Sequence, residues 1–225
     1  MLANPFLPKD EYCESQLEQI MQHVLACHKL MVIDGIPIAN NENKIRNRLI
    51  KNYLMNQKVK NKIGISGFRF FPEVAIIDDN DDEIGYTDIH VVLGGSHFDN
   101  DDAVFILECK RLDGKGGLGQ DNLNGKYVNN GIMRFTSDPE KYPSYFRING
   151  MIGFCVRPFD VQINTIQKLN QHLVQWCPNE IINPIVQEIF IDNFEYTYSS
   201  VHRITSSQKV IKLYHLMLDT SSLHE

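Results

Sequence analysis

Apolar residues at helical spacing mark the first predicted element of the chain. Within residues 10–34 they recur every three or four positions, which predicts an amphipathic helix. The positions that carry this pattern are Leu17, Ile20, Met21, Val24 and His28. The segment GIPIANN ends the pattern, and Asn41 or Asn43 is a suitable N-cap for a second helix that continues to Leu54.

Three segments rich in β-branched and aromatic residues follow the two helices. They span residues 62–77, 85–95 and 103–112, and the polar turns DDNDDE and SHFDNDD separate them. This order predicts a three-stranded antiparallel meander. The third segment begins AVFIL, which lacks alternation and indicates a strand buried on both faces, and it then continues into Glu108, Cys109 and Lys110.

The remaining pattern predicts a mixed α/β (α+β) fold. Residues 122–135 are expected to form a helix, 148–156 a buried strand and 160–176 another helix, and the tail is expected to form one or two hairpins. We therefore expect a central mixed sheet flanked by helices, in one domain over residues 1–225. Its expected parts are an N-terminal helical segment at 1–35, a core at 40–180 and a β-rich C-terminal extension at 183–225.

Composition favours a soluble, cytoplasmic protein. The 225 residues are 43% hydrophobic and 22% charged, and no apolar run approaches the roughly 18 residues of a membrane span. The N-terminus lacks the pattern of a signal peptide. No association with a membrane is therefore expected. The five cysteines are scattered without a Cys-x-x-Cys pair, which predicts reduced thiols and argues against a disulfide framework or a zinc ribbon.

The distribution of charge leaves a nucleic-acid partner open. A formal net charge of −6 counts against such a partner. Residues 44–72, however, contain no acidic side chain and eight basic ones, which can present a basic face to phosphates. The eight are Lys44, Arg46, Arg48, Lys51, Lys58, Lys60, Lys62 and Arg69. The alternative is a solvated, cation-rich helix surface.

The end of the third strand carries the candidate chemistry. Alternation on a strand places Glu108 and Lys110 on one face and the Cys109 side chain on the other, and it likewise groups Asp88 with His90. If the two strands are neighbours, two carboxylates and a lysine converge, which suits Mg²⁺ and metal-assisted phosphodiester hydrolysis. The alternative is a cross-strand charge pair on a solvated sheet face.

This arrangement resembles the PD-(D/E)xK nuclease superfamily, which has the restriction-endonuclease-like fold, over residues 40–155. Asp88 matches the first carboxylate of the motif, Glu108 with Lys110 matches E-x-K, and Glu42 matches a glutamate from the preceding helix. Thr87 stands where the motif has proline, and GYTD is similar to the Gly-x-x-Asp form of exonuclease-like members. YVNNGIMRF followed by GMIGFCV is similar to small nucleases of bacterial antiphage (antiviral) defence loci.

The resemblance implies a metal-dependent nuclease, with DNA as the favoured substrate. Asp88, Glu108 and the backbone carbonyl of Cys109 would bind Mg²⁺ or Mn²⁺, and Glu42 would act as a further ligand or orient a water. Lys110 would position the attacking water and help to deprotonate it. The products would carry a 5′-phosphate and a 3′-hydroxyl.

Four further residues are candidates for contact with the substrate, namely His90, Lys126, Tyr127 and Arg134. The alternatives are a hydrogen-bonded histidine under a helix for the first and ordinary helix surface or core for the others. The chain lacks a P-loop motif, so an ATPase or sensor partner is expected, and a homodimer is a further expectation. The rival function is a non-catalytic subunit that binds nucleic acid or a protein partner.

Overall fold

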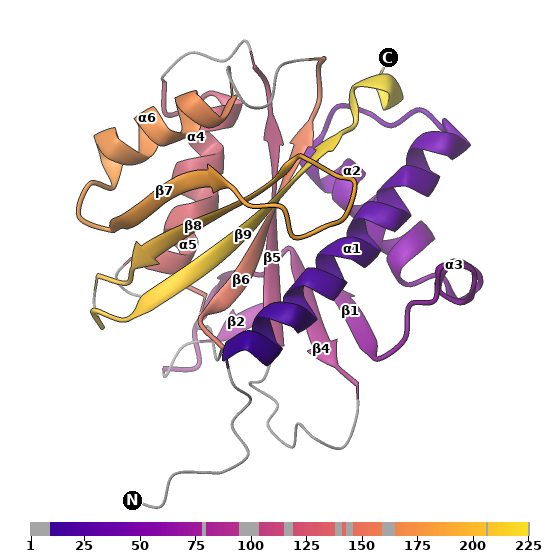
Figure 1. Ribbon diagram of the computed structural model, residues 1–225, viewed down its shortest axis with the longest axis horizontal. Helices are drawn as coiled ribbons and strands as arrows, with labels where there is room; N and C mark the ends of the chain where they lie inside the picture. The colour runs from indigo at the N-terminus through magenta and orange to yellow at the C-terminus, as the bar shows by residue number, and fades with distance from the viewer. Residues whose placement is uncertain are drawn as a thin grey trace, which may run out of the picture.

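The chain folds around one seven-stranded mixed sheet. A computed structural model describes residues 10–77, 80–94, 104–114, 119–137, 141–142, 146–158, 165–205 and 207–224. The strands of the sheet lie in the order β1-β4-β5-β6-β9-β8-β7. Helices cover both sides of this sheet (Figure 1), so the predicted mixed α/β class is confirmed.

The N-terminal helices agree with the sequence pattern, with one addition. α1 (Asp10–Asp34) is followed by α2 (Glu42–Leu49), and the π-helical turn η1 (Ile50–Leu54) continues α2. The Asn41 side chain caps α2 by accepting a hydrogen bond from the Lys44 amide at 3.1 Å. The pattern did not predict α3 (Gln57–Ile63), which ends at Gly64 in the left-handed conformation, with φ of 75°.

The predicted antiparallel meander is present in β1 (Phe68–Pro72), β4 (Ile89–Leu93) and β5 (Val104–Leu112). The prediction of one strand per segment was wrong for the first two segments. The end of the first segment and the start of the second leave the main sheet. They pair with each other as β2 (Ala75–Ile77) and β3 (Glu83–Tyr86). Pro72, which has no amide hydrogen, ends β1 at this departure.

The second half of the chain completes the sheet. The expected helix consists of α4 (Leu123–Tyr127), the π-helical turn η2 (Val128–Ile132) and α5 (Met133–Thr136). The expected buried strand is β6 (Ile148–Cys155), and α6 (Gln167–Trp176) follows. The other elements are β7 (Ile181–Gln187), β8 (Thr197–Arg203), β9 (Val210–Asp219) and the short 3₁₀ helix η4 (Ser221–Leu223).

The C-terminal strands are part of the central sheet. β9 pairs in parallel with β6 along its whole length, and β8 and β7 extend the sheet as antiparallel neighbours. The tail was predicted to form one or two hairpins. In the structure β7, β8 and β9 form a three-stranded antiparallel meander, and the other edge of β9 pairs with β6.

Adjacent residues of β6 identify which helices cover each face. Gly150 faces Met21 of α1, whereas the neighbouring Met151 faces Gly131 of η2. One core layer therefore lies under α1 to α3, and a second lies under α4 to α6 (Figure 1). In the described part of the chain, no helix combines the length and the apolar character needed to cross a bilayer. All five cysteines lie in the described part of the chain, and each is a buried thiol outside any disulfide.

Candidate active site

The pairing of β4 with β5 places the candidate carboxylates opposite each other. Ile89 lies opposite Leu107, so Asp88, which immediately precedes β4, comes next to Glu108. Asp88 is 7% exposed, Glu108 is 0% exposed and Lys110 is 6% exposed. The structure thus brings together the three residues that strand alternation groups, and it buries all of them at one end of the two strands.

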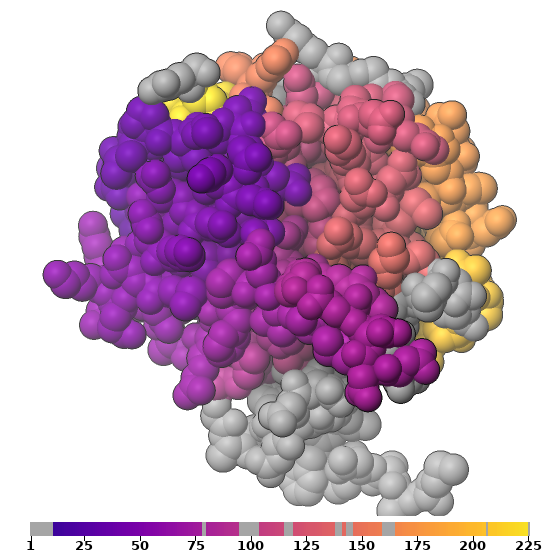
Figure 2. Space-filling view, turned by 180° about the vertical axis from the view of Figure 1, so that it is seen from behind, coloured from indigo at the N-terminus to yellow at the C-terminus, as the bar shows by residue number. Residues whose placement is uncertain are grey.

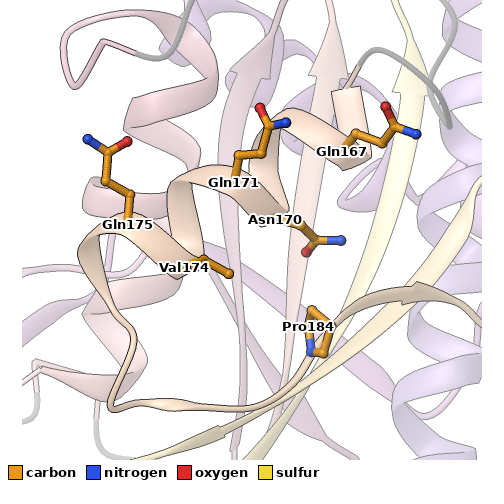
Figure 3. Close-up of a pocket in the computed structure, with 6 residues that line it drawn as sticks. All are labelled: Gln167, Asn170, Gln171, Val174, Gln175 and Pro184. Atoms are coloured by element: carbon orange, nitrogen blue, oxygen red, sulfur yellow. The ribbon is translucent and has the colours of Figure 1, made fainter.

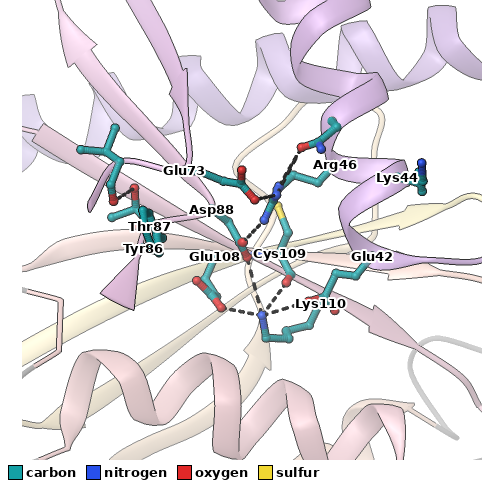
Figure 4. Close-up of polar contacts among 12 residues, drawn as sticks. Glu42, Lys44, Arg46, Glu73, Tyr86, Thr87, Asp88, Glu108, Cys109 and Lys110 are labelled. Atoms are coloured by element: carbon teal, nitrogen blue, oxygen red, sulfur yellow. Dashed lines mark hydrogen bonds and ion pairs between the residues drawn. The ribbon is translucent and has the colours of Figure 1, made fainter. Parts of the chain in front are cut away.

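The ammonium of Lys110 lies among four oxygen atoms (Figure 4). Its Nζ donates to Glu108 Oε1 at 2.5 Å and to the Cys109 carbonyl at 2.8 Å. Glu42 Oε1 is 3.2 Å away and Asp88 Oδ2 is 3.6 Å away. The aliphatic part of Lys110 packs close to η2, because a Cβ added to Gly131 would lie 3.4 Å from Lys110 Cγ. A cationic group is therefore held at the centre of an oxygen-rich site.

Glu42 reaches this centre from the first turn of α2. Its Oε1 faces Lys110, while its Oε2 accepts a hydrogen bond from the Arg111 amide at 3.0 Å. The Arg111 guanidinium in turn donates to the Asn40 carbonyl at 2.7 Å, which fixes the start of α2 against β5. The chain contains a second Glu-x-Lys sequence, Glu42-Asn43-Lys44, at the start of α2. Its lysine does not join the cluster, because Lys44 is exposed on the helix surface (Figure 4).

Arg46, one turn after Glu42 on α2, is a member of the site that the sequence did not identify. The sequence pattern placed it in a basic surface, but it is only 3% exposed. Its guanidinium donates to Asp88 Oδ1 and to Glu73 Oε1. Glu73 has φ of 51°, the left-handed region that few residues other than glycine adopt, at the point where the chain leaves β1. Arg46 therefore ties α2 to both the β1–β2 connection and the start of β4.

Tyr142 and Arg134 close the site from the other side. The Tyr142 hydroxyl donates to Glu108 Oε2 at 2.6 Å, and Arg134 Nη1 lies 3.4 Å from Glu108 Oε1. Arg134 also donates to the Tyr142 hydroxyl, and the Tyr142 oxygen is 2.9 Å from the Tyr86 carbonyl of β3. No sequence pattern pointed to Tyr142, since it lies in an irregular stretch without periodicity.

These segments adjoin one another on the surface. In the space-filling view, the violet N-terminal helices and the pink helical segment lie side by side, with magenta residues of the β1–β4 region below them (Figure 2). The three segments provide Glu42, Arg134 and Asp88, respectively. The site therefore lies where the two helical layers meet across the ends of β4 and β5.

Electrostatic coupling changes the proton affinity of the buried groups. Burial, followed by repulsion from Asp88, raises the pKa of Glu108 to about 7, although Lys110 and Arg134 act in the opposite direction. Burial alone would lower the pKa of Lys110, but attraction to Glu108, Asp88 and Glu42 outweighs it and leaves that pKa above its usual range. At neutral pH Lys110 is therefore charged, and Glu108 lies close to its titration midpoint.

The other predicted substrate contacts lie in different environments. His90 is half-buried in β4, and burial lowers its pKa. Tyr127 is fully buried, with its hydroxyl 2.8 Å from His215 Nδ1, so the structure places it in the core between α4 and β9. Lys126 is exposed on α4. Of the four candidates, Arg134 alone contacts the carboxylate cluster among the described residues.

Cys109 contributes its backbone to the site. Burial raises the pKa of its thiol well above the usual range, which is the expected behaviour of a core thiol and keeps it protonated. Its amide donates to Asp88 Oδ2 at 2.8 Å, and its carbonyl accepts from Lys110. The thiol itself packs in the core layer under α1 to α3.

The oxygen set fits a hard divalent cation. Over the described residues, no three His, Cys, Asp or Glu side chains stand close enough together to hold a metal on their own. Mg²⁺ does not need three, because it is usually bound by one or two carboxylates and keeps several waters. Asp88, Glu108 and the Cys109 carbonyl supply such a set, and they already surround one cationic nitrogen.

Comparison with protein-family models, with curated proteins and with solved structures finds no match for this chain.

Proposed function

We propose that the protein is a metal-dependent nuclease that hydrolyses phosphodiester bonds, with DNA as the favoured substrate and an active site of the PD-(D/E)xK type. The observation that carries the proposal is the convergence of four oxygens, from Glu42, Asp88, Glu108 and the Cys109 carbonyl, on the Lys110 ammonium. A buried carboxylate of raised pKa, here Glu108, beside a positioned lysine is typical of catalytic sites.

The residues of the cluster have distinct roles in this proposal. Asp88, Glu108 and the Cys109 carbonyl would hold Mg²⁺ or Mn²⁺, which when bound supplies Lewis-acid stabilisation of charge on phosphate oxygens. Lys110 orients the attacking water and stabilises its negative charge as the proton leaves. Glu42 accepts a hydrogen bond from that water or from Lys110. Arg46 positions Asp88, and Arg134 and Tyr142 position Glu108.

Exposed cations in the segment from α2 to β1 support a nucleic-acid substrate. Five basic side chains between residues 44 and 69 are exposed, and these are Lys44, Lys51, Lys58, Lys62 and Arg69. Lys44 lies two residues after Glu42, on the exposed side of the helix that delivers Glu42 to the site. Cations placed beside a carboxylate cluster attract the phosphate backbone without reading sequence.

Cleavage of supercoiled plasmid and of a labelled single strand tests the proposal, with Mg²⁺, with Mn²⁺ and with EDTA. We expect cleavage that requires metal and falls at least 100-fold in Asp88→Asn and Lys110→Met. Lys212→Met is the matched control, because Lys212 also pairs with two carboxylates and contacts a tyrosine, but it lies on β9, which β6 separates from β5. Metal-dependent cleavage that survives unchanged in both site variants would contradict the assignment.

A specific observation also favours the second candidate, a non-catalytic subunit. Each of the six carboxylate oxygens of Glu42, Asp88 and Glu108 already has a protein donor within 3.4 Å. A purely structural ion cluster requires that each of its buried charged atoms has a protein partner in this way. Isothermal titration with Mg²⁺ separates the two functions, since a structural cluster gives no binding heat and a DNA affinity that is unchanged in Glu108→Gln.

A further inference from the structure

A polar pocket of about 550 Å³ lies between the α4–η2–α5 segment and the end of α6. Its chemistry differs from that of the adjacent groove between α6 and β7, whose lining side chains are amides, a valine and a proline (Figure 3). The pocket contains a tryptophan, a lysine, an aspartate and four amide side chains. Its lining residues are Gln120, Asp121, Lys126, Asn129, Asn130, Met133, Gln175 and Trp176.

The pocket is continuous with the proposed active site along one helical segment. Lys126, Asn129 and Asn130 recur at helical spacing on its outward side, and Met133 extends the row. The next residue, Arg134, contacts Glu108. Asn130 lies four residues before Arg134 on this segment.

The lining matches the groups of a nucleotide. Trp176 is half-buried and packs against His172, with ring centroids 4.2 Å apart and ring planes tilted by 33°, so the indole is held against α6 at the pocket wall. Aromatic faces bind unpaired bases of any sequence, and amide side chains bond the edges of those bases. Lys126 lines the same pocket, where its ammonium would be available to a phosphate, outside the carboxylate cluster.

We propose that this pocket binds an unpaired base of the nucleic-acid strand next to the scissile phosphate, with the base on Trp176 and its edge facing Asn129 and Asn130. A base paired within a duplex is stacked on its neighbours and cannot lie on Trp176 without being flipped out. The proposal rests on the proposed nuclease function and narrows its substrate to a single strand, or to a strand opened at the site.

The sole tryptophan of the chain provides the test, because its fluorescence reports on the pocket and not on cleavage. A single-stranded 12-mer of mixed sequence is titrated into the Asp88→Asn variant in EDTA, where the substrate stays intact. We expect saturable quenching, and at least ten-fold weaker binding of the same sequence as a duplex. Absence of quenching, or equal binding of the duplex, would overturn the proposal.

Substitutions show which residues contribute to the affinity for the 12-mer, which is measured by the fluorescence anisotropy of the labelled strand. Trp176→Ala is expected to weaken binding about ten-fold, while Trp176→Phe, which keeps an aromatic face, stays within about three-fold of the parent. Asn130→Ala should weaken binding, and Gln171→Ala is the matched control, since Gln171 is exposed on α6 but lines the groove of Figure 3. Equal effects of the Trp176→Ala and Gln171→Ala variants would exclude the pocket.

The outcome separates this proposal from the nuclease proposal. If the 12-mer quenches the tryptophan and the Trp176→Ala substitution weakens binding, but the wild-type protein cleaves no substrate, the pocket proposal is retained and the nuclease proposal is refuted. Metal-dependent cleavage without quenching, and without an effect of Trp176→Ala, would retain the nuclease and refute the pocket.

Discussion

Replacement of Lys110 by methionine is the sharpest test of the buried cluster, because it removes one charge and keeps the length of the side chain. Lys110 is 6% exposed, and its closest partner, Glu108, is fully buried. Removing one member of a buried ion pair costs about 3–5 kcal/mol. At about 2.5 kcal/mol per molar urea for a chain of this size, the unfolding midpoint should fall by about 1.5 M.

The loss should depend on pH through Glu108. Because burial raises the folded-state pKa of Glu108 to about 7, the folded chain binds more protons than the unfolded chain between its ordinary pKa of 4.5 and pH 7. Stability from this group is therefore present at low pH and is lost as pH rises through the folded pKa. Lys110 lowers that pKa, so its removal extends the loss above pH 7.

Urea unfolding in EDTA at pH 6 and at pH 8.5 measures this dependence. We expect the difference in unfolding free energy between wild type and Lys110→Met to be smaller at pH 6, where Glu108 is mostly protonated and the contacts with Asp88 and Glu42 are the ones lost, and about 3–5 kcal/mol at pH 8.5. Lys212→Met should cost about 0.5–1 kcal/mol at both values, since Lys212 and its partners Glu14 and Glu188 are 24%, 32% and 37% exposed. Equal costs for the two variants, or a cost for Lys110→Met that does not change with pH, would refute the reasoning.

Three further predictions concern stabilisation by Mg²⁺, the loss of stability in acid, and Arg46, the second cation that contacts the cluster. In thermal unfolding, 5 mM Mg²⁺ should stabilise Lys110→Met more than wild type, because the ammonium no longer competes for the same oxygens. Burial lowers the pKa of His202 to about 4, so stability is lost as pH falls below about 6.5, and His202→Leu should lose about 2 kcal/mol less than wild type between pH 7 and pH 5 in urea unfolding. Arg46→Lys should lose about 2 kcal/mol in urea and most cleavage activity, because an ammonium cannot reach both Asp88 and Glu73 as the guanidinium does.

The elements that the sequence predicted are those with strong local signals. The apolar spacing of residues 10–34 matches α1 from end to end, and the unbroken AVFIL run matches a strand with neighbours on both sides. α3 was missed because QKVKNKI has little apolar periodicity, and the helix is instead defined by the Asn56 cap and the left-handed Gly64. The separate β2–β3 pair was missed because it depends on how the chain turns at Glu73, which pattern alone does not show.

The residues of the site also fall into two groups, those that local sequence patterns predicted and those that only the tertiary structure revealed. Alternation along β5 and the position of Asp88 before β4 were sufficient to group three of its members, because strand geometry is fixed at short range. Arg46 was indistinguishable from seven other cations in a basic segment until the fold buried it against Asp88. Tyr142 lies in an irregular stretch, where only tertiary structure could place its hydroxyl on Glu108.

The energetics of the cluster bear on which of the two proposed functions it serves. A buried ion cluster is a weak source of stability, because apolar residues of similar volume often replace one at no cost. The cost is visible at Glu108, whose pKa of about 7 shows that burial opposes its charge even beside Lys110 and Arg134. A divalent cation would relieve this penalty by taking the place that the ammonium now holds, and Lys110 would then be free to face a water. The carboxylates are therefore better suited to receive a cation and a phosphate than to hold the sheet together, which favours the nuclease over the structural role.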